Sequence, residues 1–169
     1  HLNLMIKILM VDDHLIVREG IKRIIHDTKD ISIVAEASNG DEALLLVSEL
    51  DLDLILLDIS MPGKNGLQTL KEIKKIKSKI PVLMLSMHAE EQYAMRSIKA
   101  GASGYLTKDS AAEKLVTAIR KIHSGRKYIS SEVAELMITD IYYEEEKILH
   151  SLLSDREFEI LKFILNGDA

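Results

Sequence analysis

Four apolar runs, each followed by polar side chains, constrain the fold of this chain more than any other feature. The runs span residues 6–11, 52–57, 82–85 and 104–107. The polar residues that follow them are Asp12 with Asp13, Asp58, Ser86 and Lys108. Because the carboxyl ends of parallel strands meet at one edge of a sheet, these side chains are predicted to converge there. Three carboxylates, a hydroxyl and an ammonium suit a divalent cation and a phosphoryl group.

Strand-like and helix-like segments alternate five times along residues 5–125. Continuous apolar runs are typical of strands that are buried on both faces. A second strand is expected at residues 31–37, and helices are expected after each strand, the last of them at 111–123. Asn39 with Glu42 resembles an N-terminal capping arrangement at a helix start, and Ser110 with Glu113 resembles a capping box. This alternation predicts an α/β fold with a parallel sheet and right-handed crossovers.

Composition narrows the class of protein. The chain has 169 residues, of which 47% are hydrophobic, so it can form one domain with a core and an appendage. It has no cysteine, which excludes disulfides and thiolate metal sites and favours a cytoplasmic location. No apolar run is long enough to span a bilayer, so no membrane association is expected. Strand character begins near Met5, and the preceding residues 1–4 are read as an irregular start.

Charge is distributed unevenly. Residues 128–169 hold 3 basic and 10 acidic side chains, against 19 basic and 17 acidic in residues 1–127. A nucleic-acid-binding surface is expected to be basic, which this C-terminal stretch is not. A helix is predicted at residues 130–141, followed by a polar patch at 142–146. A second helix is predicted at 158–165, with a capping box of Ser154 and Glu157 before it.

Five motifs resemble the receiver domain of bacterial two-component response regulators, in the subfamily of nitrate-response and nodulation-type transcription factors with a LuxR-like helix-turn-helix output. Four of them, in the receiver, are Met10–His14, Leu54–Gly63, Val82–Ser86 and Gly104–Lys108. The fifth, Leu153–Leu161, is similar to the opening of the output domain.

The resemblance implies a flavodoxin-like (βα)5 receiver with a five-stranded parallel sheet in the order 2-1-3-4-5. The receiver is expected at residues 5–125, a helical linker at 126–150 and an incomplete helix-turn-helix fragment at 151–169. No recognition helix follows, so the chain is expected to be truncated within its output domain. DNA binding is expected only through the full-length output domain. The apolar side chains of residues 158–165 are then expected to be disordered or packed on a receiver.

Asp58 is the phosphoacceptor that the resemblance implies, taking a phosphoryl group from a sensor histidine kinase. From the residue alone, an aspartate that caps the following turn is the alternative. Asp12, Asp13, Asp58 and the backbone carbonyl of Ser60 are implied to hold Mg²⁺ or Mn²⁺, with Asp12 the less direct ligand. Such a protein is self-phosphorylating and undergoes autodephosphorylation, but it is not a turnover enzyme.

Further roles follow from the same resemblance. Lys108 is implied to contact Asp58 and the phosphoryl oxygens, and the Ser86 hydroxyl to donate to one of these oxygens. Ser86 and Tyr105 are implied to form the conformational switch, which is expected to control homodimerisation. His88 and Ser60 are implied to tune dephosphorylation. Family members often have a cis proline after the lysine, but Asp109 follows here, so a trans peptide bond is predicted.

Other functions fit these residues less well. A stand-alone phosphorelay or phosphate-sink receiver has the same site, but it needs no output helix such as the one predicted at residues 158–165. A hydrolase with an aspartate nucleophile generally needs a second acid two residues later, where this chain has Ser60. No glycine-rich loop follows the first strand, which disfavours a nucleotide- or flavin-binding fold. A zinc site is disfavoured because no two histidines have ligand spacing.

Overall fold

A computed structural model describes residues 5–87 and 91–167 of the chain. The chain divides into two compact units, residues 1–130 and 131–169. The predicted limits of receiver, linker and output fragment stay predictions. In the described ranges no helix is long and apolar enough to cross a membrane.

The first unit is a five-stranded parallel sheet in the order β2-β1-β3-β4-β5, as predicted. Its strands are β1 (Ile6–Val11), β2 (Ile31–Ala37), β3 (Leu54–Asp58), β4 (Val82–Ser86) and β5 (Gly104–Thr107). Its helices are α1 (Leu15–His26), α2 (Gly40–Glu49), α3 (Gly66–Ile76), α4 (Glu91–Lys99) and α5 (Ala111–His123), with a short 3₁₀ turn, η1 (Lys108–Ser110), before α5.

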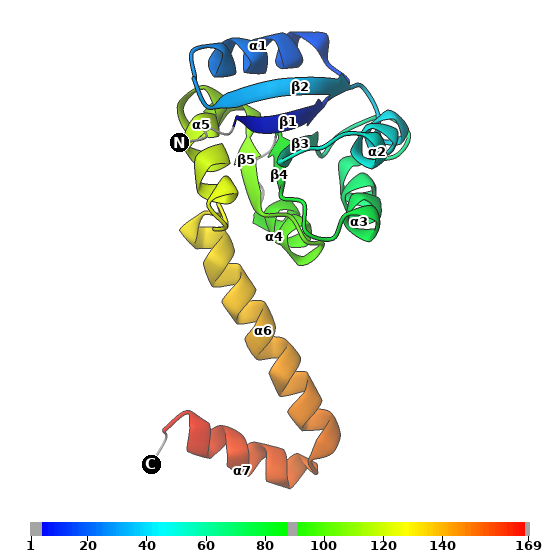
Figure 1. The fold of residues 1–169 in the computed structure, drawn as a ribbon. Coiled ribbons are helices and arrows are strands. Elements are labelled where there is room, and N and C mark those ends of the chain that lie inside the picture. Colours follow the sequence, from blue (N-terminus) through cyan, green and yellow to red (C-terminus); the bar gives the residue numbers. More distant parts are fainter. Residues whose placement is uncertain (1–4, 88–90, 168–169) are drawn as a thin grey trace. The chain divides into compact units, whose positions relative to one another are not determined.

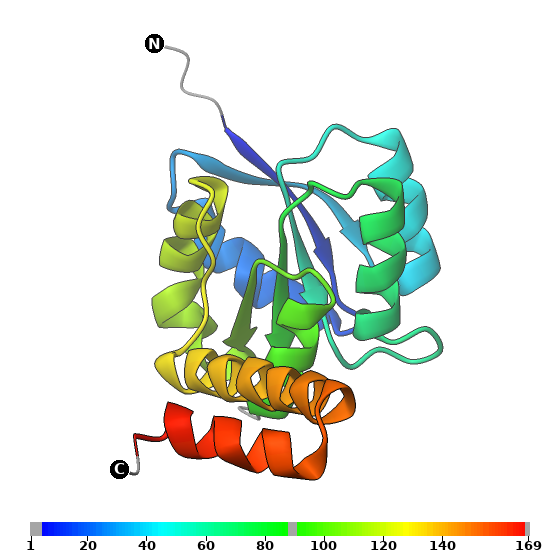
Figure 2. The same ribbon diagram turned by 90° about the horizontal axis from the view of Figure 1, so that it is seen from below.

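Helices cover both faces of this sheet, which is why its strands are apolar throughout (Figures 1 and 2). Alternate side chains of each strand point to opposite faces. Ile8 and Met10 of β1, with Leu56 of β3, belong to one core that also holds buried residues of α1 and α5. Helices α2, α3 and α4 lie on the other side (Figure 2). The sheet is therefore a well-packed support for the side chains at its carboxyl edge.

The free edge of β5 is covered by the segment that follows α5. Tyr105 N–H donates to the Tyr128 carbonyl at 3.1 Å, and Tyr128 N–H donates to the Ser103 carbonyl at 2.9 Å. Gly104 pairs with Tyr128 as an isolated bridge. A Cβ on Gly104 would lie 2.9 Å from the Tyr128 carbonyl oxygen, so a larger residue there would push this segment away. Tyr128 thus adds a single bridge at the edge of the sheet. The helical linker predicted to begin at residue 126 is wrong for residues 126–130, which are not helical because their backbone runs along β5.

The second unit consists of α6 (Ser131–Leu152) and α7 (Asp155–Leu165). The polar patch expected at residues 142–146 does not interrupt α6, because tyrosine and glutamate are tolerated within a helix. The predicted capping box is confirmed: Ser154 and Glu157 exchange side-chain-to-backbone hydrogen bonds at the start of α7. The expectation of disorder is wrong, since α7 is helical and Phe158, only 7% exposed, packs edge to face on His150 of α6.

Two other local predictions had different outcomes. The Asn39 side chain accepts from Glu42 N–H, as predicted for the start of α2. The capping box of Ser110 and Glu113 is wrong: Ser110 lies in the helical region and makes no cap, and its hydroxyl instead lies 2.6 Å from the Thr107 Oγ1. The 3₁₀ turn before α5 takes Ser110 out of the extended conformation that an N-cap requires.

Candidate functional site

Strand register sets Asp12 and Asp58 beside each other. Val11 pairs with Leu57 in the parallel ladder of β1 and β3, so the two aspartates come next on neighbouring strands. Both side chains are almost fully buried, Asp12 at 1% and Asp58 at 0% exposed. Two carboxylates at such a position are costly unless positive charge or a cation compensates them.

Lys108 supplies positive charge that compensates these two carboxylates. It follows β5, and its Nζ lies 2.8 Å from Asp12 Oδ2 and 3.2 Å from Asp58 Oδ1. The lysine side chain is itself only 8% exposed. Burial alone would lower the pKa of Lys108, but its contacts with Asp12 and Asp58 outweigh burial, and the pKa lies above its usual value. The ammonium therefore stays charged between the two carboxylates.

Asp58 has an environment that disfavours its own ionisation. Burial raises the pKa of its carboxyl above the ordinary value, the negative charge of Asp12 adds to this, and Lys108 and a hydrogen bond from Ser60 N–H oppose it. The Ser60 N–H donates to Asp58 Oδ1 at 3.2 Å. Asp58 Oδ2 is buried, and among the described residues it has no hydrogen-bond partner. That oxygen is available for a cation or for bond formation.

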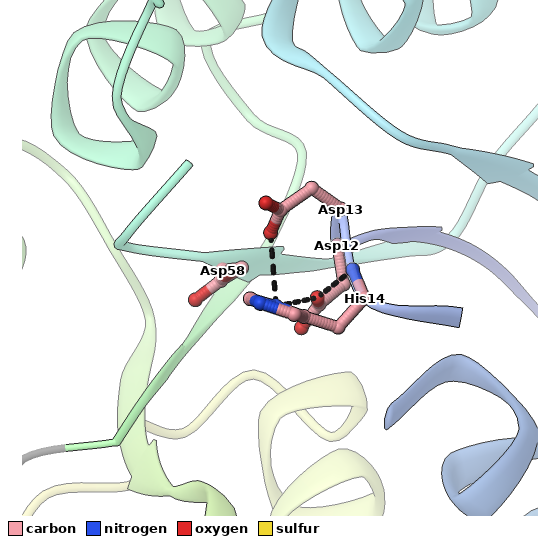
Figure 3. Close-up of side chains that lie close together, drawn as sticks. All are labelled: Asp12, Asp13, His14 and Asp58. Atoms are coloured by element: carbon pink, nitrogen blue, oxygen red, sulfur yellow. Dashed lines mark hydrogen bonds and ion pairs between the residues drawn. The ribbon is translucent and has the colours of Figure 1, made fainter. Parts of the chain in front are cut away.

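Asp13 and His14 complete the acidic cluster on the side of β1 (Figure 3). The Asp13 side chain is 23% exposed, and its Oδ1 lies 3.1 Å from His14 Nδ1. The carboxylates of Asp12, Asp13 and Asp58 and a His14 ring nitrogen offer ligand atoms that all lie within 4.8 Å of one another. This donor set, with the unsatisfied oxygen of Asp58, fits a divalent cation. Asp12, Asp13, Asp58 and Lys108 thus converge at the carboxyl edge of the sheet.

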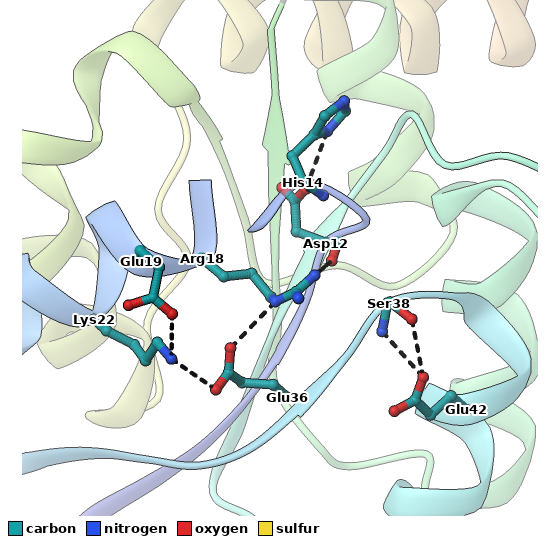
Figure 4. A network of polar contacts seen from close by, with 8 residues as sticks. All are labelled: Asp12, His14, Arg18, Glu19, Lys22, Glu36, Ser38 and Glu42. Atoms are coloured by element: carbon teal, nitrogen blue, oxygen red, sulfur yellow. Dashed lines mark hydrogen bonds and ion pairs between the residues drawn. The ribbon is translucent and has the colours of Figure 1, made fainter. Parts of the chain in front are cut away.

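A polar network on the other side of β1 holds the segment that carries Asp12 (Figure 4). Arg18 Nη1 of α1 donates to the Asp12 backbone carbonyl at 2.5 Å, and its Nε donates to Glu36 of β2 at 3.2 Å. Lys22 also contacts Glu36, at 3.0 Å, and Glu19 at 2.7 Å. The network ties α1 and β2 to the backbone of the acidic pair. Sequence reasoning missed Arg18, because a bond to a backbone carbonyl leaves no pattern in the side chains.

The structure gives the positions of two other predicted site residues, Ser86 and Tyr105. Ser86 ends β4 and is fully buried, next to Leu85, which pairs with Asp58 in the ladder. Tyr105 is half-buried in β5. His88 lies outside the described residues. The peptide bond between Lys108 and Asp109 is trans, as predicted.

The same chain is similar to known proteins over most of its length. Residues 8–120 match the response regulator receiver domain family. The chain is 39% identical over 164 residues to the response regulator UvrY of Escherichia coli strain K12, covering 96% of this chain and 75% of that protein. It is 36% identical over 163 residues to the response regulator GacA of Pseudomonas aeruginosa, covering 96% and 76%.

The fold of this chain is also similar to solved structures of response regulators. A two-component response regulator of the LuxR family from Aurantimonas sp. SI85-9A1 has a TM-score of 0.74 at 35% identity, covering 82% of this chain and 99% of that one. The receiver domain of the response regulator NarL from Mycobacterium tuberculosis has a TM-score of 0.68 at 32% identity, covering 73% and 99%.

Proposed function

Because the chain belongs to the response regulator receiver domain family of two-component systems, we propose that Asp58 is the residue that accepts the phosphoryl group. The observation that carries the proposal is the unsatisfied Oδ2 of Asp58 beside the Lys108 ammonium, at the edge where strand ends converge. An ionised carboxylate is a competent nucleophile for phosphorus. One chain takes one phosphoryl group, so the protein is a stoichiometric acceptor and not a turnover enzyme.

The transfer is a substitution at phosphorus. A carboxylate oxygen of Asp58 forms a bond to phosphorus, and the bond from phosphorus to the donor breaks. With a sensor histidine kinase as donor, the leaving group is the imidazole nitrogen, which keeps the bonding pair and takes up a proton. The product on this chain is a mixed anhydride of carboxylic and phosphoric acids.

Asp12, Asp13 and Asp58, with the Ser60 carbonyl, are the groups that we propose to hold Mg²⁺ or Mn²⁺. The buried oxygens of Asp12 and Asp58 and the partly exposed carboxylate of Asp13 match the oxygen ligands that such ions prefer. When bound, the cation would supply positive charge against the incoming phosphoryl oxygens and would favour the ionised form of Asp58, which its surroundings otherwise disfavour.

Lys108 and Ser86 are proposed to hold the phosphoryl group once it has been transferred. Lys108 already lies 3.2 Å from Asp58 Oδ1 and donates as a point charge. Ser86 ends the neighbouring strand, where its hydroxyl can donate to a phosphoryl oxygen. Fixed donors of this kind stabilise the charge that develops in phosphoryl transfer and need little rearrangement to do so.

Tyr105 and Ser86 are proposed to pass the signal on. Phosphorylation adds roughly 1.5 to 2 negative charges at Asp58, which draw Ser86 towards the phosphoryl group. Tyr105 lies on β5, two residues before Thr107, which pairs with Ser86 in the ladder. It turns inward into the space that the movement of Ser86 leaves. The surface formed by α4, β5 and α5 then changes shape and controls homodimerisation. Such a switch is a shift between two packings of one fold.

A transcriptional output is the function that we propose for the whole protein, with DNA bound through a complete helix-turn-helix domain. Support comes from α7, whose capping box matches the predicted start of that domain. The relatives add to it, because they are named response regulators and this chain covers three quarters of their length. A stand-alone phosphorelay receiver would have the same site. The presence of α7 favours the transcriptional reading over that alternative.

The test uses the small phosphodonor acetyl phosphate with Mg²⁺, followed by intact-protein mass spectrometry. Wild type is expected to gain one phosphoryl group, while Asp58→Asn gains none because an amide is a poor nucleophile. Asp51→Asn is the matched control, since Asp51 is an exposed aspartate that contacts Lys7 at the opposite end of the strands. A phosphoryl group on the Asp58→Asn protein would contradict the proposal.

A further inference from the structure

The backbone of Asp12 leaves the sheet at the point where its side chain enters the site. The ladders of β1 with β2 and β3 have their last pairs at Val11. Asp12 N–H still donates to the Ala37 carbonyl of β2 at 3.1 Å, but the Asp12 carbonyl lies beyond the last pair. A backbone acceptor in a residue that is 1% exposed requires a donor. Arg18 Nη1 of α1 is that donor, at 2.5 Å.

Arg18 is itself anchored to β2 (Figure 4). Its Nε donates to Glu36 Oε1 at 3.2 Å, and Lys22 Nζ lies 3.0 Å from the other oxygen of Glu36. The Arg18 side chain is 16% exposed. A guanidinium has several donors in one rigid plane, so it can hold a carbonyl and a carboxylate at the same time. The backbone of Asp12 is therefore tied to the end of β2 twice, directly through Ala37 and indirectly through Arg18.

The carbonyl that Arg18 contacts belongs to the peptide group between Asp12 and Asp13. Because a peptide group is planar, its direction sets how the two residues stand relative to each other. Asp12 Oδ1 also accepts from the His14 N–H at 2.8 Å, which fixes the Asp12 carboxylate against the same turn of the chain. In this arrangement Asp12, Asp13 and Asp58 each offer an oxygen within 4.8 Å of the others. The bond from Arg18 thus holds two of the proposed ligands in one geometry.

We propose that Arg18 is a positioning residue for the cation site. The inference rests on the metal site that is part of the proposed function. The Arg18 side chain donates to the Asp12 carbonyl and to Glu36, so it acts on the two carboxylates through the backbone that joins them. Ligands that are already in place bind an ion more tightly, because no free energy is spent on ordering them. Arg18 accordingly raises the affinity for Mg²⁺ and has no part in the bond-forming step.

Titration calorimetry with Mg²⁺, in the absence of a phosphodonor, tests this directly. Arg18→Met keeps most of the apolar stem and removes the donors, and it is expected to weaken Mg²⁺ binding about tenfold. Arg120→Met is the matched control, since Arg120 of α5 donates to both oxygens of Asp30, at 2.9 and 2.8 Å, at the other end of β2. The control is expected to bind Mg²⁺ within about twofold of wild type.

The Mg²⁺ dependence of phosphorylation separates positioning from a general loss of structure. With acetyl phosphate as donor, Arg18→Met is expected to need about tenfold more Mg²⁺ for half-maximal rate. Its rate at saturating Mg²⁺ should stay within about twofold of wild type, because the ion then orders the ligands itself. A rate that is lowered equally at every Mg²⁺ concentration, or an unchanged Mg²⁺ affinity, would overturn the role of Arg18.

Glu36→Ala decides the question if Arg18→Met does not fold. Glu36 is on the outer strand β2 and its side chain is 34% exposed, so its loss leaves the core intact. Arg18 keeps its donors but loses its anchor, and Mg²⁺ binding is expected to weaken about threefold. Unchanged binding in Glu36→Ala would overturn the positioning role and leave the metal site standing. If wild type itself binds no Mg²⁺, the proposed metal site fails, and the role of Arg18 fails with it.

Discussion

The carboxyl edge of the sheet and the helix pair of residues 131–167 keep their structures by opposite means. At the edge, charged side chains are buried and their positions are set by strands whose apolar residues are almost fully covered. In the helix pair, Ile160, Ile164 and Leu165 are more than half exposed, and α7 depends on its capping box and on Phe158. Chemistry between buried charges requires a rigid support, whereas a helical segment can form on local signals and one anchoring contact.

The largest expected effect on stability and phosphorylation comes from adding a single methyl group beneath the site. A Cβ on Gly66, the first residue of α3, would lie 2.1 Å from the Asp58 carbonyl oxygen and 2.6 Å from the Ile59 Cα. These are backbone atoms and cannot move aside cheaply. Gly66→Ala is expected to lower the free energy of unfolding by about 3 kcal/mol or more and to abolish phosphorylation by acetyl phosphate. Denaturant unfolding and intact mass measure the two effects.

Gly20→Ala is the matched control for this substitution. Gly20 lies within α1, and a Cβ there would meet nothing within 4 Å. Alanine has the higher helix propensity, so this variant is expected to be more stable by roughly 0.5–1 kcal/mol and to be phosphorylated like wild type. Equal behaviour of the two variants would show that the loop after β3 is not tightly held.

Removing the charge of Asp58 is expected to stabilise the metal-free protein. Its pKa is raised by burial and by Asp12, so ionisation costs free energy in the folded state. Asp58→Asn is expected to raise the melting temperature at pH 7 by roughly 2–4 °C, which corresponds to about 1 kcal/mol. Mg²⁺ should raise the melting temperature of wild type but not of this variant. Asp51→Asn should give no gain, because Lys7 lowers the pKa of Asp51.

The pH dependence of that gain follows from the direction of the shift. The folded pKa of Asp58 lies above the unfolded value of 3.8, so the folded state binds more protons in the interval between them. Wild type then loses stability, relative to Asp58→Asn, as pH rises through this interval, and the difference is constant above it. A difference in melting temperature that shrinks as pH rises towards 7 would contradict the raised pKa.

The smallest expected effect on the site comes from the helix pair. Phe158→Ala removes the contact with His150 and should reduce the helical signal of α7 in far-ultraviolet circular dichroism. Phosphorylation of Asp58 should stay within about twofold of wild type, because the site is built from strand ends packed within the first unit. A large loss of phosphorylation would mean that the two regions depend on each other.

Much of the fold could be predicted because apolar runs end where strands end. The predicted first strand and last helix of the sheet unit match β1 and α5, while the strand order came from the family resemblance. Ser110 shows the limit: the Ser-x-x-Glu pattern is present, but a 3₁₀ turn precedes the helix and removes the cap. The bridge of Tyr128 to β5 could not be predicted, because pairing between backbones leaves no side-chain pattern.

Some residues of the candidate site could be predicted from the sequence and others could not. Asp12, Asp58 and Lys108 could be identified because each directly follows or ends a strand, where parallel topology brings them together. The hydrogen bonds that the His14 backbone N–H and the Arg18 side chain donate to Asp12 could not be predicted, because a bond that involves the backbone leaves no pattern in the sequence. Sequence therefore predicts which groups meet at the edge, and the structure adds what holds them there.

Chemical trapping of the phosphorylated residue tests the central claim most directly. The protein is treated with acetyl phosphate and Mg²⁺ and then with borohydride, which reduces an aspartyl phosphate to homoserine. Tandem mass spectrometry of the resulting peptides is expected to place homoserine at position 58 and at no other aspartate. Homoserine at position 12 or 13, or none at all in a protein that carries a phosphoryl group, would contradict the account.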